Sequence, residues 1–497
     1  MAPEITSEQR ESLTLLATTY ALSHGLVYLP PADVQPAAPT STIHAPLALF
    51  PSPFPRKQFE HARELQSAYN VLYARVAMDE AFLDRVMGAE EGVGRVDEFT
   101  GELWKIWRRL RDEGTQQWHL GLFRSDYLLH APEGEEPCLK QVEFNTISSS
   151  FGALSENISK LHRHLVATTE YFNSSPLLKL ENMPPNETIA GLAEGLATAH
   201  KTYGSPSAWV LFVVQAGERN VFDQRWLEYE LLEKHSLRVI RQTLDELATS
   251  AEVVPTSRIL RIKRPGLLPR GAESVEISTV YFRAGYTPTD YPTPAHYNTR
   301  YLLEKSVAIK CPSVQLQLAG GKKVQEVLTQ GNHLQRYLHP PHGLTSSNLT
   351  ENVRRSWMGM WGLNEGEGVA KARAQAEKLV LKPQREGGGN NVYKGDIPPF
   401  LNTLPEHERE AWIAMELIQT PSGLGNYLVR AGSGTEGAVK AEVISELGIF
   451  GWALFGGPSE SVQEKQVGWL LRTKTKDSNE GGVAAGFSVL DSLVLVN

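Results

Sequence analysis

The chain has 497 residues, 41% of them apolar, which is long enough for about three domains with large buried cores. Its 49 Lys and Arg residues stand against 57 Asp and Glu residues, giving a net charge of −8. This balance argues against a general nucleic-acid binder and against a protein of anionic membrane surfaces. A small-molecule partner is the better expectation.

Composition also indicates the cellular compartment of the protein. The chain has two cysteines, Cys138 and Cys311, too few for a disulfide scaffold or a cysteine-based zinc site. Its first residues, MAPEITSEQRESLTLL, are acidic and polar where a signal peptide is basic and then apolar. The longest apolar stretch, residues 208–214, is far shorter than the roughly 20 residues that span a bilayer. We therefore expect a cytoplasmic protein without a membrane partner.

The N-terminal part is predicted to be mainly helical. Helical spacing covers residues 5–23, 56–90 and 98–122, and the proline-rich segment 30–55 is expected to be an irregular surface loop. The period changes at PCLKQVEFNTI, which alternates like a strand from Pro137. The following SSSFGALSENISKLHRHLV predicts a turn and then a helix capped by serine.

A βαβ unit is predicted next. Residues 209–214 (WVLFVV) form a continuous apolar run typical of a strand covered on both faces. A helix beginning near Phe222 and a second strand, LRVIRQTL, follow it. This pattern predicts a small parallel-sheet domain over about 206–320, with residues 255–274 as a surface excursion.

The third part has another organisation. Strands are predicted at 377–382, 411–417 and 442–449, separated by loops and helices. The first of these strands runs into LKPQREGGGNNVY, residues 381–393, with three consecutive glycines. Neither the Walker nor the Rossmann glycine spacing fits this stretch, and AGGKK at 319–323 has Lys323 where a Walker loop needs Ser or Thr.

Two interpretations of the three glycines stay open from the residues alone. A glycine run is commonly a turn or hinge, but it also lets successive backbone N–H groups converge on a phosphate. The flanks favour a nucleotide lid, because Lys382 supplies a positive charge and Glu386 a carboxylate for a hard cation.

Other polar residues have comparable alternatives. Glu143 and Asn145 lie two apart on a predicted strand and so share a face, which suits Mg²⁺ ligands as well as a solvated strand face. Arg124, Arg472 and Lys474 could hold carboxylates or could be surface charges. Glycines around ELGIFG, residues 446–451, indicate either backbone close to a ligand or tight turns.

Taken together, these stretches resemble the eukaryotic-type glutathione synthetases. The resemblance rests on motifs that occur in order along the chain, which are RSDY at 124–127, EFNTIS at 143–148, YGSP at 203, ERNVFDQR at 218–225, QLAGGKKVQ at 315–325, LKPQREGGGNN at 381–391, SELGIFG at 445–451, LLRTK at 470–474 and GGVAAG at 481–486.

The resemblance implies an α/β fold with an ATP-grasp body, a glycine-rich lid and an inserted parallel-sheet substrate-binding domain. The implied division is 1–205 for the N-terminal helices and part of the body, 206–321 for the substrate domain, and 322–497 for the remaining body with a lid at about 340–410. The implied reaction is the ATP-dependent ligation of γ-glutamylcysteine with glycine to give glutathione, ADP and phosphate through an acyl phosphate. Family members are homodimers.

The resemblance also implies site residues, by position in this sequence. Implied Mg²⁺ ligands are Glu143, Asn145 and Glu386, and the implied catalytic residues are Arg472, Lys322 and Lys382. The implied ATP site comprises Glu143, Lys322, Lys382, Pro383, Gln384, Arg385, Glu386, Gly387, Gly388, Gly389, Asn390, Asn391, Tyr393, Met415, Glu416, Leu417, Ile418, Glu446, Lys474 and Glu480. The implied dipeptide and glutathione site comprises Arg124, Ile147, Ser148, Ser149, Ser150, Glu218, Arg219, Asn220, Gln224, Arg283, Ala284, Gly285, Tyr286, Arg472, Val483 and Ala484.

Some positions depart from the family pattern. RAGY at 283–286 has Ala284 where animal enzymes have Asp, and Glu480 stands where they have Asp. Two rival functions share the same motifs in part. A phosphotransferase would make ADP without glycine, and a regulator would bind Mg-ATP without turnover.

Overall fold

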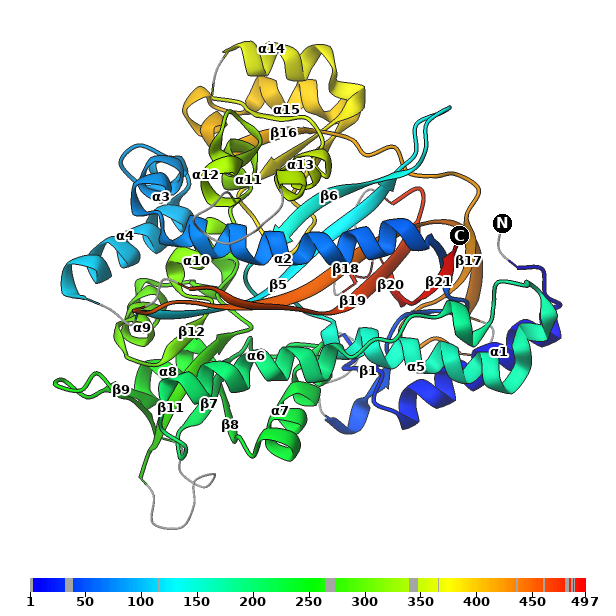
Figure 1. The fold of residues 1–497 in the computed structure, drawn as a ribbon, viewed down its shortest axis with the longest axis horizontal. Coiled ribbons are helices and arrows are strands. Elements are labelled where there is room, and N and C mark those ends of the chain that lie inside the picture. The colour runs from blue at the N-terminus through cyan, green and yellow to red at the C-terminus, as the bar shows by residue number, and fades with distance from the viewer. Residues whose placement is uncertain are drawn as a thin grey trace.

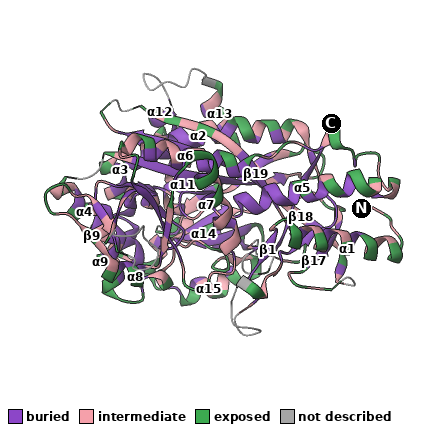
Figure 2. Ribbon diagram, turned by 90° about the horizontal axis from the view of Figure 1, so that it is seen from below, coloured by how far each residue is buried: buried purple, intermediate pink, exposed green. Residues whose placement is uncertain are grey.

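A long mixed sheet with helices on both faces forms the centre of the molecule, and a smaller sheet stands beside it (Figure 1). The structure is a computed structural model that describes residues 3–31, 39–114, 117–263, 273–338, 347–364, 366–434, 437–458, 461–478, 482–483, 486 and 488–497. Buried residues concentrate in the middle, and exposed residues gather on the outer helices such as α1 (Figure 2). None of the helices in these ranges combines the length and apolar character that crossing a bilayer needs.

The central sheet has 13 strands within the described ranges. Its main order is β17-β3-β20-β19-β18-β5-β12-β11-β10-β9, while β6 pairs with β5, and β7 pairs with β11 and β8. The strands of its body are β3 (Leu47–Ala48), β5 (Trp118–His130), β6 (Cys138–Asn145), β17 (Gly425–Val429), β18 (Ala438–Gly456), β19 (Gln463–Thr475) and β20 (Ser488–Asp491).

Strand β18 shows how the sheet is covered. Because side chains alternate along a strand, Leu447 and Ile449 pack into one core with α2, while Phe450 and Trp452 pack into another with α5 and α6. The helices of these layers are α1 (Ser7–Ser23), α2 (Arg56–Met78), α3 (Glu80–Met87), α4 (Glu98–Glu113), α5 (Gly152–Thr169) and α6 (Thr188–Tyr203).

The predicted βαβ unit is present. Strands β7 and β8 are parallel, as are β7 with β11 and β11 with β12. A single pair, Lys310 with His119, joins this parallel part to β5. Its elements are β7 (Trp209–Val213), α7 (Val221–His235), β8 (Val239–Gln242), α8 (Leu244–Ser250), β9 (Ala251–Val253), β10 (Leu260–Ile262), β11 (Val275–Phe282), α9 (Pro294–Lys305), β12 (Ile309–Cys311) and α10 (Val314–Ala319).

The smaller sheet carries the glycine-rich stretch. Its four described strands have the order β13-β16-β14-β15, all pairs are antiparallel, and the sheet has a hydrophobic core of its own. Its elements and the helices before it are α11 (Lys322–Thr329), α12 (His333–Leu338), α13 (Ser347–Arg355), β13 (Met360–Gly362), α14 (Gly366–Ala374), β14 (Leu379–Pro383), β15 (Val392–Tyr393), α15 (Ile397–Thr403) and β16 (Trp412–Glu416).

Several expectations about elements were wrong. The helix predicted over 98–122 ends at Glu113, and β5 begins at Trp118, because tryptophan and leucine suit a buried strand as well as a helix. Within the segment 30–55, residues 45–52 are buried, and β3 enters the central sheet. The excursion predicted over 255–274 includes β10, which pairs with β9 and β11, while residues 264–272 lie outside the described ranges.

The N-terminal segment adds short strands that meet the end of the chain. Strand β4 pairs with β21 in parallel, and β1 pairs with β2. These strands are β1 (Val27–Tyr28), β2 (Ile43–His44), β4 (Ser52–Pro55) and β21 (Leu493–Val496).

The start of α5 differs from its prediction too. No serine caps it; the carboxylate of Asp223 in α7 accepts from the backbone N–H groups of Phe151, Ala153 and Leu154 at 2.8, 2.9 and 3.3 Å. A cap from a distant helix has no local sequence pattern. This contact fixes the turn after β6 against the parallel part of the sheet.

Candidate active site between the two sheets

A cavity of about 470 Å³ lies between the central sheet and the smaller sheet. It is lined by residues from β5, β6, β18 and β19 on one side and by the glycine-rich hairpin, β14 and the end of β16 on the other. The residues named from the sequence that line it are Arg124, Glu143, Asn145, Ile147, Ser148, Ser150, Tyr286, Lys322, Lys382, Arg385, Glu386, Gly387, Gly388, Asn390, Asn391, Tyr393, Met415, Glu416, Leu417, Ile418, Glu446, Arg472, Lys474 and Val483.

Strand registers bring the charged residues of the central sheet together. Arg124 on β5 is paired with Asn145 on β6, and Glu446 on β18 is paired with Arg472 on β19. Gly448 leaves room for this cluster, because a Cβ there would lie 2.8 Å from Cδ of Arg124. Gly448 therefore makes space for a neighbouring side chain in mid-strand and does not form a turn.

Asp126 is a functional residue to which the sequence interpretation gave no role. Its carboxylate is fully buried and accepts from Nε and Nη2 of Arg124 at 2.6 and 2.8 Å. It also accepts from Nη2 of Arg472 at 3.1 Å and from Nδ2 of Asn145 at 2.9 Å. The available signal was its alternation with Arg124, which puts both side chains on one face of β5. Asp126 thus orients three side chains of the cavity wall.

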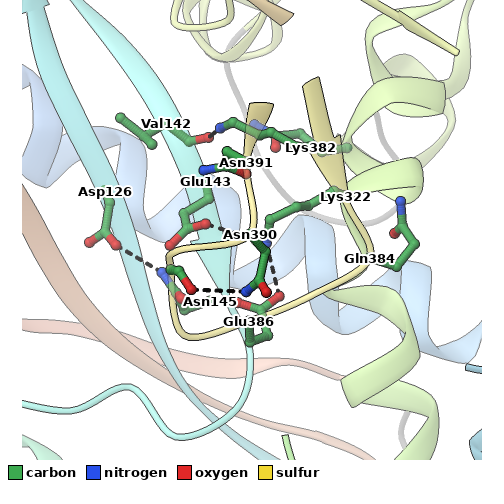
Figure 3. Close-up of polar contacts among 12 residues, drawn as sticks. Asp126, Val142, Glu143, Asn145, Lys322, Lys382, Gln384, Glu386, Asn390 and Asn391 are labelled. Atoms are coloured by element: carbon green, nitrogen blue, oxygen red, sulfur yellow. Dashed lines mark hydrogen bonds and ion pairs between the residues drawn. The ribbon is translucent and has the colours of Figure 1, made fainter. Parts of the chain in front are cut away.

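Lys322 bridges two acids across the cavity. Its Nζ lies 3.4 Å from Oε2 of Glu143 on β6 and 3.1 Å from Oε1 of Glu386 on the glycine-rich hairpin (Figure 3). Burial would raise the pKa of Glu143, but the surrounding lysines and arginines outweigh it and lower the pKa to about 2. Burial raises the pKa of Glu386, against the pull of Lys322. The two acids that share Lys322 therefore have pKa values shifted in opposite directions.

Lys382 ends β14 beside this group. Its Nζ donates to the backbone oxygen of Val142 at 2.8 Å, which holds it against β6. Burial, together with the ammonium of Lys322, lowers the pKa of Lys382 to about 8 against the opposing effect of Glu143. Its positive charge is therefore only partly compensated by the protein and is available to an anion.

The glycine-rich stretch is a hairpin between β14 and β15. Gly387, Gly388 and Gly389 have φ of 95°, 74° and 76°, which L-residues rarely adopt. Beyond them, Asn391 donates to the hydroxyl of Tyr393 at 3.2 Å. The turn and the lid, kept as alternatives from the residues, are thus compatible, since the hairpin itself forms one wall of the cavity.

Part of the cavity wall is apolar. Its residues come from both sheets and include Leu128, Val142, Val380, Met415, Leu417, Ile418 and Ile444. The sequence interpretation named only three of these, Met415, Leu417 and Ile418. Such a slot between two sheets suits a flat, weakly polar group.

A second cavity of about 210 Å³ adjoins the first, and both share Ser148, Ser150 and Tyr286. The turn that separates them holds Ser148 at a φ of 52°, and the backbone oxygen of Ser150 accepts from Nη1 of Arg124 at 3.1 Å. The remaining lining residues are Tyr28, Gln215, Glu218, Arg219, Asn220 and Arg283. Tyr28 and Gln215 were not named from the sequence.

Seven named residues line neither cavity, and their ligand contacts stay predictions. They are Ser149, Gln224, Ala284, Gly285, Pro383, Gln384 and Gly389. Gln224 accepts from Arg241 at 2.7 Å and donates to Glu218, so it supports a lining residue from behind. Gln384 donates to Ala411 and accepts from the backbone of Lys323. Glu480 and Ala484 lie outside the described residues.

The smaller sheet is tied to the helical layer by ion pairs. Nη1 of Arg385 lies 2.6 Å from Oδ2 of Asp97, the residue that caps α4. Arg95 pairs with Glu410 close by. Arg385 therefore lines the cavity, while its guanidinium pairs with Asp97 of the helical layer.

Comparisons with known proteins agree with this architecture. A family model described as eukaryotic glutathione synthase, ATP binding domain, matches residues 7–495. The glutathione synthetase of Homo sapiens is 37% identical over 491 residues, covering 98% of this chain and 97% of that protein. The glutathione synthetase large chain of Schizosaccharomyces pombe is 35% identical over 518 residues, covering 99% and 98%.

A solved structure supports the fold. The apo form of a glutathione synthetase-like effector from Globodera pallida superposes with a TM-score of 0.75 over 99% of this chain and 98% of that chain, at 22% sequence identity. The predicted fold class, an α/β ATP-grasp body, is consistent with this match and with the family model. The chain belongs to the eukaryotic glutathione synthetase family, the ATP-dependent enzymes that make glutathione.

Proposed function

We propose that the two adjoining cavities hold ATP and γ-glutamylcysteine end to end, so that the cysteinyl carboxylate is activated by ATP and then joined to glycine. One observation carries this proposal. Strand registers place Leu128 and Ile444 toward one end of the larger cavity, then Glu143 with its partner Lys322, then Arg124 and the turn at Ser150 that borders the second polar cavity. That is the order of a base, a triphosphate, a carboxylate and an amino-acid head group.

We also propose a division of the chain into domains. Residues 206–321 form the domain that binds the dipeptide, and residues 1–205 and 322–497 form the ATP-grasp body with a lid at about 340–410. The parallel strands of the first unit join the body through one residue pair, and the lid sheet has its own core, which supports this division.

The acids and the amide of the cavity fit Mg²⁺. Glu143, Glu386 and Asn145 offer oxygen atoms, the ligands that Mg²⁺ prefers. Nδ2 of Asn145 is used by Asp126 and by the backbone oxygen of Arg124, so its Oδ1 is the atom left for the cavity. Bound there, Mg²⁺ would offset the charge of the phosphate oxygens. Glu143 and Glu386 would hold it in place of part of their contact with Lys322.

The protein groups suit acyl-phosphate formation. A carboxylate is a poor electrophile, and bringing it to a triphosphate places two anions together. Lys322 and Lys382 face the phosphates in this arrangement, and Arg124 and Arg472 face the substrate carboxylate. Because Asp126 fixes both arginines before substrate arrives, little reorganisation is needed when charge moves in the transition state.

The hairpin of Gly387, Gly388 and Gly389 would exclude water from the acyl phosphate until the amine of glycine attacks. We assign Val483, which lines the larger cavity, to the site of the glycine acceptor.

A coupled assay separates this function from the rivals. We expect ADP release that needs both γ-glutamylcysteine and glycine, with one glutathione formed per ADP. Release of ADP without glycine at an equal rate would identify a phosphotransferase, and binding of ATP without any release would identify a regulator.

Lys382→Ala is expected to lower kcat/KM by roughly 10²–10³, the size of losing one preorganised electrostatic contact. Because the pKa of Lys382 is about 8, its ammonium is present below that pH and lost above it. The affinity of the wild type for a non-hydrolysable ATP analogue should therefore fall as pH rises through about 8. Calorimetric titration across pH 6.5–9.5 measures this.

The variant itself and a second lysine provide the controls. Lys382→Ala should bind weakly with a flat pH profile between 7 and 9. Lys476→Ala removes a cavity-rim lysine that is 42% exposed and should leave the profile of the wild type intact. A flat profile for the wild type would contradict the role given to Lys382.

Gly388→Val is expected to impair turnover more than folding. Valine is strained at the φ of 74° that this residue has, so the hairpin would not keep the shape that closes the cavity. Gly423→Val is the matched control, because Gly423 has a φ of 77° and a Cβ there would meet no atom within 4 Å. The two variants should lose similar stability in thermal unfolding, and only Gly388→Val should lose kcat. Equal kcat values for the two variants would show that the hairpin is a structural turn with no special role in turnover.

We also propose a homodimer in the cytoplasm. Near the contact of Trp226 with Gly25, Leu22 on α1 and Tyr229 and Leu232 on α7 are 52%, 50% and 52% exposed, which supports an apolar contact face. The free thiols of Cys138 and Cys311 support a reducing compartment. Sedimentation at the mass of one chain, or fractionation with an organelle, would contradict these assignments.

A further inference from the structure

Tyr28 reaches the second cavity from the N-terminal segment. It ends β1, and the next residue, Leu29, exchanges two hydrogen bonds with Arg219, one from the Leu29 N–H at 3.0 Å and one from Arg219 Nε at 3.1 Å. The guanidinium of Arg219 lies 5.9 Å from the centre of the Tyr28 ring, and the ring of Phe151 lies 6.3 Å away. The phenol is thus held rigidly beside the turn that carries Glu218 and Asn220.

Two buried polar atoms on residues that line this cavity have no hydrogen-bond partner among the described residues. They are the hydroxyl oxygen of Tyr28 and Oδ1 of Asn220. Their residues are 2% and 4% exposed. Buried polar groups are nearly always hydrogen-bonded, and leaving one without a partner is unfavourable. Two such atoms from separate segments beside one cavity, together with the Arg283 guanidinium on the same wall, indicate a ligand with matching polar groups.

The chemistry of these atoms defines the ligand. Asn220 Oδ1 accepts a hydrogen bond, the Arg283 guanidinium donates, and a phenol can do either. Burial and the nearby carboxylate of Asp223 raise the pKa of Tyr28 well above its usual value, so the hydroxyl keeps its proton and can donate. The carboxyl group of Glu218, 3.7 Å from Nη2 of Arg283, adds an acceptor on the cavity wall. An ammonium and a carboxylate on one carbon atom complement this set.

We infer that Tyr28 is a substrate-binding residue whose hydroxyl donates to the α-carboxylate of the γ-glutamyl group, together with the guanidinium of Arg283, while the ammonium of that group donates to Oδ1 of Asn220. This inference rests on the proposed function, since it places the γ-glutamyl end of the dipeptide in the second cavity. It adds a residue more than 100 positions before the substrate domain to the substrate site.

Removal of an unpartnered hydroxyl should affect the stability of the free enzyme and the affinity for substrate differently. In the free enzyme it makes no hydrogen bond, so its removal should not lower stability. In the complex its loss leaves a carboxylate oxygen without a donor. Tyr28→Phe, which removes only this oxygen, should keep or raise the melting temperature and weaken dipeptide binding about 10- to 100-fold, as expected for a hydrogen bond to a charged group.

Tyr171→Phe is the matched control. Tyr171 is also fully buried, but its hydroxyl donates to the backbone oxygen of Leu49 at 3.0 Å, and it lines neither cavity. This variant should lower the melting temperature and leave the dissociation constant of the dipeptide unchanged. The two phenylalanine variants are therefore expected to show reversed patterns of stability and affinity.

Calorimetric titration of γ-glutamylcysteine into the full-length enzyme, alongside steady-state kinetics and thermal unfolding, tests the inference. For Tyr28→Phe we expect a raised dissociation constant and a raised KM for the dipeptide, with kcat and the KM for ATP unchanged. An unchanged dissociation constant for the dipeptide, with a wild type that makes glutathione normally, would overturn the role of Tyr28 and leave the proposed function intact. A wild type that does not bind the dipeptide would contradict the proposed function itself.

Two dipeptide analogues identify the contacted group. With 4-aminobutanoyl-cysteine, which lacks the α-carboxylate, wild type and Tyr28→Phe should bind with equal affinity. With glutaryl-cysteine, which lacks the ammonium, the difference between them should persist. The reverse pattern would overturn the assignment of the Tyr28 hydroxyl to the carboxylate.

Discussion

One buried carboxylate organises the central part of the site. Asp126 is fully buried and is bonded by two arginines and one asparagine, which come from β5, β19 and β6. A buried carboxylate is costly unless its charge is paired and its oxygens accept hydrogen bonds, and here both conditions hold. Because the arginines cannot satisfy Asp126 without taking these positions, the site is largely shaped before any ligand binds.

Around this carboxylate, the electrostatics change gradually from one sheet to the other. The arginines at the central sheet are held by acids, Lys322 is shared by two acids, and Lys382 is only partly compensated, with a pKa of about 8. The least compensated cations thus lie toward the smaller sheet, where the glycine-rich hairpin forms the wall. An anion bound there would neutralise positive charge that the acids of the protein only partly compensate.

Sequence patterns were sufficient to predict the elements that depend on neighbouring residues alone. The run at 209–214, the following helix and the strand after it were predicted correctly as a βαβ unit, because period and polarity decide such elements. Motifs also identified most residues of the larger cavity, since strand alternation places Glu143 and Asn145 on one face. The helix predicted through residue 122 failed because the Trp- and Leu-rich stretch fits either a helix or a buried strand.

Long-range contacts were beyond such reasoning. Asp223 caps a helix about 70 positions earlier, and nothing near Phe151 reveals it. Tyr28 belongs to no motif, and it lines the second cavity because the next residue, Leu29, is hydrogen-bonded to Arg219. Alternation placed Asp126 on the same face as Arg124, but its role was not apparent because two of its three partners lie on other strands.

The strands contributed by residues 43–55 have a consequence for synthesis. Ser52 bonds Asp491, a partner 439 positions later, and β3 and β4 pair with the last two strands of the chain. At about 5–20 residues per second, a ribosome needs roughly 20–90 seconds to supply those partners. During that time the apolar strands of the nascent chain have no native neighbour on this side. The pairings of β3 with β20 and of β4 with β21 can therefore form only after residues 488–496 have been synthesised.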